Sequence, residues 1–273
     1  MRNWFITGVS SGLGRALALA ALQRGDRVAG TVRKPHASEE FEALAPGRAH
    51  AVLLDVTDHA KVARVVREVE TLTGGIDILV NNAGVSLIGT TEEAGLDEVR
   101  SLFETNFFGP LALMREVLPH MRARRRGAIV NFSSMAGFCV GSSVGAYGAT
   151  KLGLQAISDA LGQEVEEFGI HVMTVIPGAF RTALGISRRK VAGSIDDYAA
   201  GNEARAAWMD SWSGQQRGDP DKCASVILEA LDADKPPRYL VVGADAVEAV
   251  DDSLQAIRAD ISNWKERAGA TDL

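Results

Sequence analysis

Short apolar runs alternate with longer helical stretches along the whole chain, and this alternation restricts the fold more than any other feature. The apolar runs are rich in Val, Ile and Leu and lack a polar residue at every second position; they span residues 4–6, 27–32, 49–54, 77–80, 128–132, 171–176 and 238–242. Strands that are buried on both faces have this composition. The helical stretches between them span residues 12–24, 59–72, 96–122, 147–168 and 219–231. The alternation predicts an α/β fold, a doubly wound parallel seven-stranded sheet with right-handed crossovers and helices on both faces.

The length of the chain, 273 residues, allows one large domain or two small ones. We expect a single domain over residues 1–273, because α/β folds of more than about 200 residues commonly form one unit. The alternation is interrupted at about residues 179–218, and connections this long are commonly functional lids. Trp208, Met209 and Trp212 in this segment favour an ordered substrate lid.

Composition excludes several classes of protein. The net charge of −6, from 29 Lys and Arg against 35 Asp and Glu, argues against nucleic-acid and anionic membrane partners. The longest strongly apolar run, residues 16–22, is far shorter than the roughly 20 residues of a membrane span. Cys139, Cys223 and the five histidines show no metal-ligand spacing, so neither a disulfide framework nor a metal site is expected. Since the first strand begins near Asn3, we expect no signal peptide and a cytoplasmic protein.

Two clusters of basic residues call for separate interpretations. Residues 122–126 contain four arginines at the end of a helical stretch, where cations complement the helix dipole. Arg188, Arg189 and Lys190 lie in the expected lid. They could attract a carboxylate, phosphate or carrier-protein substrate, or simply remain hydrated.

A glycine-rich loop, Thr-Gly-Val-Ser-Ser-Gly-Leu-Gly at residues 7–14, joins the first strand to the first helical stretch. Glycines permit a tight turn and close backbone approach, and a helix N-terminus presents N–H groups to a pyrophosphate. The candidate contacts are Gly8, Ser10, Ser11, Gly12, Leu13 and Gly14. The spacing is Gly-x-x-x-Gly-x-Gly, and the strand-turn-helix setting is what gives it weight.

Tyr147 and Lys151 lie four residues apart at the start of a helical stretch, so they share one helical face. A neighbouring ammonium favours the phenolate and is expected to lower the pKa of the tyrosine from about 10. That makes the tyrosine a usable general acid and base.

Further polar motifs follow the later strands, namely Asn81-Asn82-Ala83-Gly84, Asn106, Ser133-Ser134, Pro177-Gly178 and Thr182. Together with the glycine loop and the Tyr-x-x-x-Lys pair, they resemble the short-chain dehydrogenase/reductase family in its compact form. The resemblance covers nearly the whole chain. It implies a Rossmann-type fold that binds a nicotinamide dinucleotide.

The resemblance also implies catalytic roles. Tyr147 would exchange a proton with the substrate oxygen, and Lys151 would lower the tyrosine pKa and bind the nicotinamide ribose. Ser134, thirteen residues before the tyrosine, would hydrogen-bond the substrate oxygen. Asn106 would position a water that connects Lys151 to solvent. Ser133 is the alternative to Ser134, but strand alternation would turn its side chain to the opposite side.

The remaining cofactor contacts come from the same resemblance. The adenine would be contacted by Asp55 and Val56. The adenosine and its ribose would be contacted by Asn82, Ala83 and Gly84. The nicotinamide end would be contacted by Pro177, Gly178 and Thr182.

Arg33 decides the expected choice of cofactor. An acidic residue at the end of the second strand would bind the adenosine ribose and disfavour a 2′-phosphate; here Val32 takes that place and Arg33 follows without a carboxylate beside it. A guanidinium suits a phosphate, with the Ser11 hydroxyl as a second donor. NADP(H) is therefore favoured over NAD(H), although Arg33 and Lys34 could also be solvated loop charges.

The sequence as a whole indicates an oxidoreductase that interconverts a carbonyl and a secondary alcohol on a hydrophobic small molecule. Apolar residues that could line its pocket are Phe138, Phe180, Trp208, Met209 and Trp212. The alternatives are a non-catalytic NADP(H)-sensing regulator, an NAD(H)-dependent alcohol dehydrogenase of the same family and, more weakly, a sugar-nucleotide epimerase or dehydratase. A homodimer or homotetramer through the long fourth and fifth helices is expected from the resemblance. Residues 244–268 read as a final helix that could serve an interface or the pocket.

Overall fold

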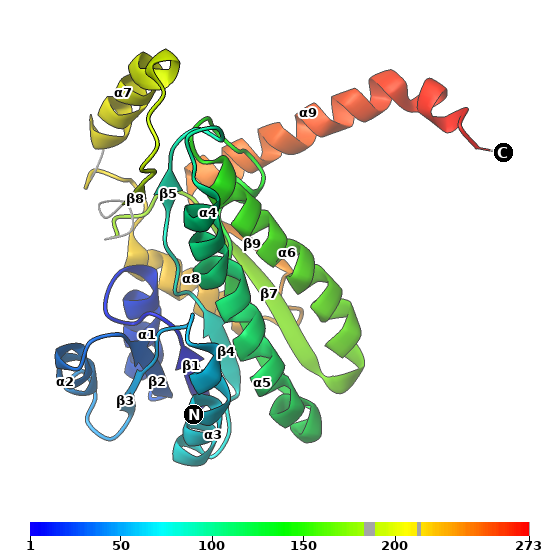
Figure 1. Ribbon diagram of the computed structural model, residues 1–273. Helices are drawn as coiled ribbons and strands as arrows, with labels where there is room; N and C mark the ends of the chain where they lie inside the picture. Colours follow the sequence, from blue (N-terminus) through cyan, green and yellow to red (C-terminus); the bar gives the residue numbers. More distant parts are fainter. Residues whose placement is uncertain (183–188, 212–213, 273) are drawn as a thin grey trace.

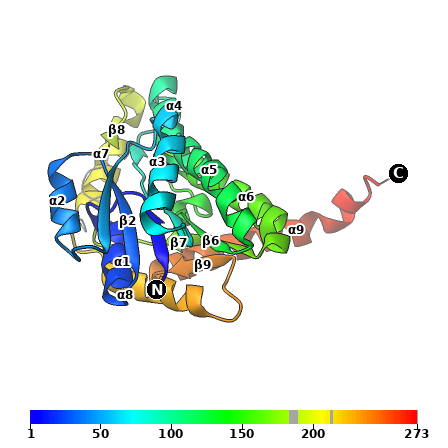
Figure 2. The same cartoon turned by 90° about the horizontal axis from the view of Figure 1, so that it is seen from below.

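The computed structural model describes residues 1–182, 189–211 and 214–272. Within these ranges, seven parallel strands form one sheet in the order β3-β2-β1-β4-β6-β7-β9 (Figures 1 and 2). The strands are β1 (Asn3–Ile6), β2 (Arg27–Val32), β3 (Ala49–Leu53), β4 (Ile78–Asn81), β6 (Gly127–Phe132), β7 (Ile170–Pro177) and β9 (Tyr239–Val242). The predicted Rossmann-type sheet is confirmed.

Helices cover both faces of the sheet. On one face lie α1 (Gly12–Gln23) and α8 (Pro220–Asp232); on the other lie α3 (His59–Thr73), α5 (Gly109–Arg124) and α6 (Gly145–Val165). Strand β1 illustrates the division, because Trp4 and Ile6 belong to the core on the α1 side and Phe5 to the core on the α3 side. Side chains alternate between the faces of a strand, so a sheet covered on both sides needs apolar residues at every position.

The order of the strands changes direction at β1: β2 and β3 lie on one side of it, and β4, β6, β7 and β9 lie on the other. Ile6 pairs with Gly30 of β2 on one side and with Val80 of β4 on the other. Ligands of open α/β sheets bind beyond the carboxyl ends of the strands at such a switch point. The loops after β1, β4 and β6 all leave from this edge.

The long helix expected over residues 96–122 is interrupted, which corrects the prediction. Helix α4 (Leu96–Phe103) continues through a π-helical turn (Glu104–Phe108) into α5. Pro110 follows this turn and has no N–H for the Asn106 carbonyl, so the regular helical bond is missing there. Three short elements were not predicted: α2 (His36–Glu42), β5 (Leu87–Ile88) and β8 (Arg189–Lys190).

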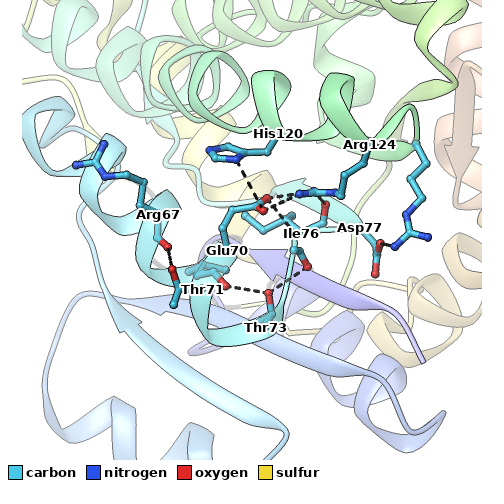
Figure 3. A network of polar contacts seen from close by, with 11 residues as sticks. Arg67, Glu70, Thr71, Thr73, Ile76, Asp77, His120 and Arg124 are labelled. Carbon is cyan, nitrogen blue, oxygen red and sulfur yellow. Dashed lines mark hydrogen bonds and ion pairs between the residues drawn. The ribbon is translucent and has the colours of Figure 1, made fainter.

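The basic residues 122–126 end helix α5, as the sequence predicted, and one of them joins two helices (Figure 3). Arg124 donates from Nη1 and Nη2 to the two carboxylate oxygens of Glu70 in α3, at 2.7 and 3.1 Å. Its Nη2 also donates to the Ile76 carbonyl at 2.8 Å. Arg125 then adopts a left-handed conformation, φ 55°, and ends the helix.

Two further helices extend beyond the layers. Helix α7 (Asp196–Ser211) lies in the segment expected to be a lid, and α9 (Ala244–Gly269) follows β9 and projects away from the body of the molecule (Figure 1). Across the described ranges, no helix has the length and apolar character to cross a membrane. In the same ranges, no group of three or more His, Cys, Asp or Glu residues is placed to hold a metal ion.

Candidate active site

The glycine-rich loop has a backbone that only glycine accommodates easily. Gly8 and Gly12 adopt left-handed φ angles of 75° and 63°, which carry a steric penalty for other residues. A Cβ on Gly14 would come within 2.5 Å of the Gly8 carbonyl oxygen. Helix α1 starts at Gly12 without a side-chain cap from Ser11. Its first N–H groups therefore suit a phosphate.

The segment after β4 is bonded directly to this loop. Asn82 Nδ2 donates to the carbonyl oxygens of Thr7 and Gly8 at 2.8 and 3.1 Å. Thr7 Oγ1 accepts from the backbone N–H groups of Asn82 and Ala83 at 3.0 and 2.9 Å. The two loops thus form one rigid edge of the site.

The other expected cofactor contacts lie around this edge. Ser10 and Ser11 are exposed, Leu13 is half-buried, and Val56 is buried next to Gly109. Thr182 approaches the loop, because its Cβ lies 3.3 Å from where a Cβ of Gly12 would be. Pro177 ends β7 and Gly178 follows it; beside them, the Asp245 carboxylate at the start of α9 accepts from the Ala179 N–H at 2.7 Å.

Ser134, Tyr147 and Lys151 come together beyond the end of β6. The Ser134 side chain hydrogen-bonds to Tyr147, and its Oγ also accepts from the Ala136 N–H at 3.2 Å. Lys151, 5% exposed, donates from Nζ to the Phe132 carbonyl at 2.8 Å. The same ammonium lies 5.8 Å from the centroid of the Tyr147 ring. A proton donor, a second hydroxyl and a buried cation therefore share one small volume.

Burial dominates the electrostatics of this group. It raises the pKa of Tyr147, while the hydrogen bond to Ser134 acts in the opposite direction. The expectation of a tyrosine pKa below its ordinary value is therefore wrong for the chain alone, because loss of hydration outweighs the hydrogen bond with Ser134. Burial also lowers the pKa of Lys151 to about 8. At neutral pH, Tyr147 holds its proton and Lys151 is still mainly charged.

Ser133 forms hydrogen bonds within the protein interior and not in the candidate site. Its Oγ donates to the Lys151 carbonyl at 3.1 Å and accepts from Gln155 Nε2 at 2.7 Å. Strand β6 ends at Phe132, so the alternation argument does not apply, and both serines face α6. Of the two, Ser134 is the one whose hydroxyl reaches Tyr147.

Asn106 lies in the π-helical turn and is 1% exposed. Its Oδ1 accepts from the Val85 N–H at 2.9 Å, and its Nδ2 donates to the Val85 carbonyl at 2.9 Å and to Thr150 Oγ1 at 3.1 Å. These bonds connect the loop after β4 to α6. Gly84 lies close to both Asn106 and Lys151, since a Cβ on this glycine would lie 3.3 Å from Asn106 Oδ1 and 3.6 Å from Lys151 Nζ.

Arg33 lies exposed after β2, as expected, but a carboxylate is nearby in space. Burial acts to raise the pKa of Asp55, yet hydrogen bonds from Thr57 and the charge of Arg33 together lower it. Asp55 Oδ1 accepts from the Thr57 N–H and hydroxyl at 3.0 and 2.8 Å. Although the sequence has no acid beside Arg33, the fold brings one from the end of β3.

The segment expected to be a lid is closed at its base. Gly218 N–H donates to the Ala179 carbonyl at 3.2 Å, and Arg181 N–H donates to the Gly218 carbonyl at 3.1 Å. Farther out, β8 pairs in parallel with β5. The segment is therefore tied both to the sheet edge and to the loop before α4.

Glu93, which sequence reasoning missed, ties α7 to that loop. Its side chain is buried, with 6% of its surface exposed. Oε1 accepts from the Ile195 N–H and from Asn202 Nδ2, both at 3.1 Å. Oε2 accepts from Asn202 Nδ2 at 2.9 Å and from the Thr90 hydroxyl at 2.7 Å. Hydrogen bonds from the Thr90 and Asn202 side chains and from the Ile195 N–H lower the pKa of Glu93 to about 2. In the sequence it is one glutamate of an ordinary polar stretch, so no pattern could have singled it out.

The described apolar residues that were expected around the substrate have different surroundings. Phe180 belongs to the core on the α1 side, Met209 is buried and Trp208 is 53% exposed. Phe138 packs edge-on against Tyr239. Trp212 and Arg188 lie outside the described residues.

Comparison with known proteins identifies the family. Residues 2–192 match the family model described as short chain dehydrogenase, so the chain belongs to the short-chain dehydrogenase family, as the resemblance implied. Its expected activity as an oxidoreductase is confirmed at this level.

Three similar proteins span most of their own length. The chain is 34% identical to oxidoreductase BOA17 of Botryotinia fuckeliana over 264 residues, 96% of each protein. It is 38% identical to a 3-ketodihydrosphingosine reductase of Bacteroides thetaiotaomicron over 240 residues, 87% of this chain and 86% of the relative. A solved short-chain dehydrogenase from Streptomyces avermitilis superposes with a TM-score of 0.91 at 40% identity and covers 100% of both chains.

Proposed function

We propose that this chain interconverts a carbonyl and a secondary alcohol on a hydrophobic small molecule, with NADP(H) as the cofactor. The observation that carries the proposal is the hydrogen-bonded pair of Ser134 and Tyr147 beside the buried ammonium of Lys151. The name of the Bacteroides relative, a 3-ketodihydrosphingosine reductase, supports a ketone as the reacting group.

The proposed chemistry divides between cofactor and protein. A nicotinamide held beside Pro177, Gly178 and Thr182 would supply or take up the hydride at the substrate carbon. In reduction, Tyr147 gives its hydroxyl proton to the substrate oxygen while Ser134 donates a hydrogen bond to the same oxygen. Lys151 stabilises the phenolate that remains, and solvent returns the proton. Asn106 positions the loop after β4 against α6 and so keeps Gly84 above the lysine.

The chain's own backbone fits a dinucleotide. Left-handed Gly8 and Gly12, together with the crowded Gly14, leave room for close approach of a pyrophosphate to the start of α1. We assign Gly8, Ser10, Ser11, Gly12, Leu13 and Gly14 to the pyrophosphate side. We assign Asp55 and Val56 to the adenine, Asn82, Ala83 and Gly84 to the adenosine ribose side, and Pro177, Gly178 and Thr182 to the nicotinamide side.

Preference for NADP(H) rests on Arg33. Its exposed guanidinium follows β2, and the exposed Ser11 hydroxyl begins α1. Both suit a 2′-phosphate. The charge of Asp55 competes for Arg33, which keeps NAD(H) as the alternative cofactor.

Residues 179–218 act as the substrate lid in this proposal, held by its closed base and by Glu93. We further propose a cytoplasmic homo-oligomer, a dimer or tetramer through the α4–α5 and α6 faces. Exposed Phe108 and Leu152 on these elements, 42% and 53% accessible, support an interface there.

The test is a panel of hydrophobic ketones offered to the purified full chain with NADPH and with NADH. Turnover should depend on Tyr147, since Tyr147→Phe retains the ring and removes the proton. Loss of turnover with unchanged cofactor binding is expected. Cofactor binding without turnover of any ketone or alcohol would instead favour the nucleotide-sensing regulator.

A further inference from the structure

Helix α9 has two parts with different surroundings. Its first turns pack on the molecule: Ala246 and Val250 are buried, and Ser253 Oγ donates to the Phe138 carbonyl at 3.0 Å. From Leu254 onward every described residue is exposed, and the helix extends clear of the body in both views (Figures 1 and 2). Most helical stability in proteins comes from packing of an apolar face, and a free helix of this length is marginal in water. The projecting half therefore lacks the support that a stable helix needs.

An apolar stripe runs along this projecting half. Leu254, Ile257, Ile261 and Trp264 are 38%, 53%, 61% and 59% exposed. Their spacings of three, four and three residues continue from buried Val250 and from Val247. Such spacing places them on one side of the helix, as in the a and d positions of a coiled coil. Single exposed apolar residues are ordinary, but a contiguous stripe marks an interaction surface.

We propose that this stripe binds the same stripe of a second copy of the chain, with the two helices antiparallel. The stripe is nearly symmetric about its middle, so a twofold axis would place Leu254 opposite Trp264 and Ile257 opposite Ile261. The contact then closes on itself, which is the commonest way that identical chains associate.

The charges of α9 favour the antiparallel direction. Residues 245–252 carry four acidic residues and no basic one, whereas residues 258–267 carry three basic and two acidic residues. Parallel helices would align the acidic segments. In the register that places Leu254 opposite Trp264, antiparallel helices would bring Asp251 and Asp252 of each copy close to Lys265 and Arg267 of the other. In particular Asp251 and Lys265, which are two heptads apart on one flank, would meet across the interface twice.

The first experiment measures the molar mass of the full chain in solution by sedimentation equilibrium over a range of concentrations. The double variant Ile257→Asp, Ile261→Asp should halve the assembly, from dimer to monomer or from tetramer to dimer. Leu72→Asp, at another exposed apolar residue, is the matched control and should leave the mass unchanged. A monomeric parent chain would overturn the proposal. An assembly that stays intact in the double variant would also overturn the proposal, provided that the double variant melts at the same temperature as the parent chain.

The second experiment tests the direction of the helices by disulfide formation. In a background with Cys139→Ser and Cys223→Ala, Leu254→Cys and Trp264→Cys are made separately. Antiparallel pairing predicts a crosslinked dimer when the two variants are mixed and oxidised, and little from either variant alone. Crosslinking of each variant with itself would contradict it. Neither experiment measures turnover, so this inference and the proposed function can fail independently.

Discussion

The Glu93 carboxylate accepts two hydrogen bonds from the Asn202 side-chain amide, at 3.1 and 2.9 Å. This contact joins residues 109 positions apart and holds α7 against the loop before α4. Bonds from the Ile195 N–H and the Thr90 hydroxyl complete the acceptor capacity of the carboxylate. This buried side chain therefore adds to the β5–β8 pairing in attaching the segment that carries α7.

Replacing Glu93 by alanine should loosen α7 without affecting the chemical step. We expect KM for the ketone to rise by about tenfold, because several hydrogen bonds to a charged group are lost, while kcat and cofactor affinity change little. Hydrogen exchange over 196–211 should accelerate in parallel. Glu68→Gln, at an exposed residue of α3, is the control. Unchanged exchange in Glu93→Ala would contradict the assigned contact.

Ser133 and Ser134 should respond to alanine in opposite ways. Ser134→Ala removes the hydroxyl that would donate to the substrate oxygen, so kcat should fall by roughly 10²-fold. The free energy of unfolding should be nearly unchanged. Ser133→Ala removes bonds to the Lys151 carbonyl and Gln155, so the free energy of unfolding should fall by about 1–3 kcal/mol with most activity retained. Steady-state kinetics and denaturant titration of both variants separate the roles. The reverse pattern would reassign the serine.

Cofactor binding should weaken as pH rises through about 8. Burial lowers the pKa of Lys151 to about 8, so the ammonium that would bind the ribose is lost above this pH. The effect of pH on folding stability has the opposite sign. Between about pH 8 and 10.5, Lys151 is protonated in the unfolded chain but has released its proton in the native chain. The contribution of this group to the free energy of unfolding therefore rises with pH. Calorimetric titration across this range checks the binding claim. Lys151→Met should bind weakly at every pH and show no such transition.

Arg124→Ala should destabilise the fold without touching the site. The substitution leaves the Glu70 carboxylate and Ile76 carbonyl without their shared donor, which should lower the free energy of unfolding by about 1–3 kcal/mol. Denaturant titration checks it, with exposed Arg122→Ala as the neighbouring control. Equal stability of the two variants would mean that the pair contributes nothing.

The sheet could be predicted from the sequence because strands buried on both faces must be apolar throughout. Strand β2 was predicted with the bounds that the structure has, Arg27–Val32. Helix α2 escaped prediction because its seven residues bury one side chain, Phe41. The π-helical turn was missed although Pro110, which lacks the N–H for the Asn106 carbonyl, stands in the sequence; the bonds of Asn106 to Val85 and Thr150 could not be seen there, because these residues are distant in sequence.

The site was predictable where motifs adjoin strand ends and unpredictable where it depends on tertiary contacts. Ser134, Tyr147 and Lys151 meet as expected because β6 and α6 bring their ends together. The direction of the Tyr147 pKa was missed, since burial cannot be judged from a spacing of four residues. The Arg33–Asp55 approach and the Glu93 contact were missed for the same reason.

The central claim, that this chain binds a nicotinamide dinucleotide and reads its 2′-phosphate with Arg33, is tested most directly by measuring the dissociation constants of NADPH and NADH for the full chain. The account predicts binding of both and at least about tenfold tighter binding of NADPH, a difference of about 1.4 kcal/mol, which Arg33→Ala removes and Lys34→Ala does not. Tighter binding of NADH would contradict the role of Arg33. Binding of neither dinucleotide would contradict the proposed function itself.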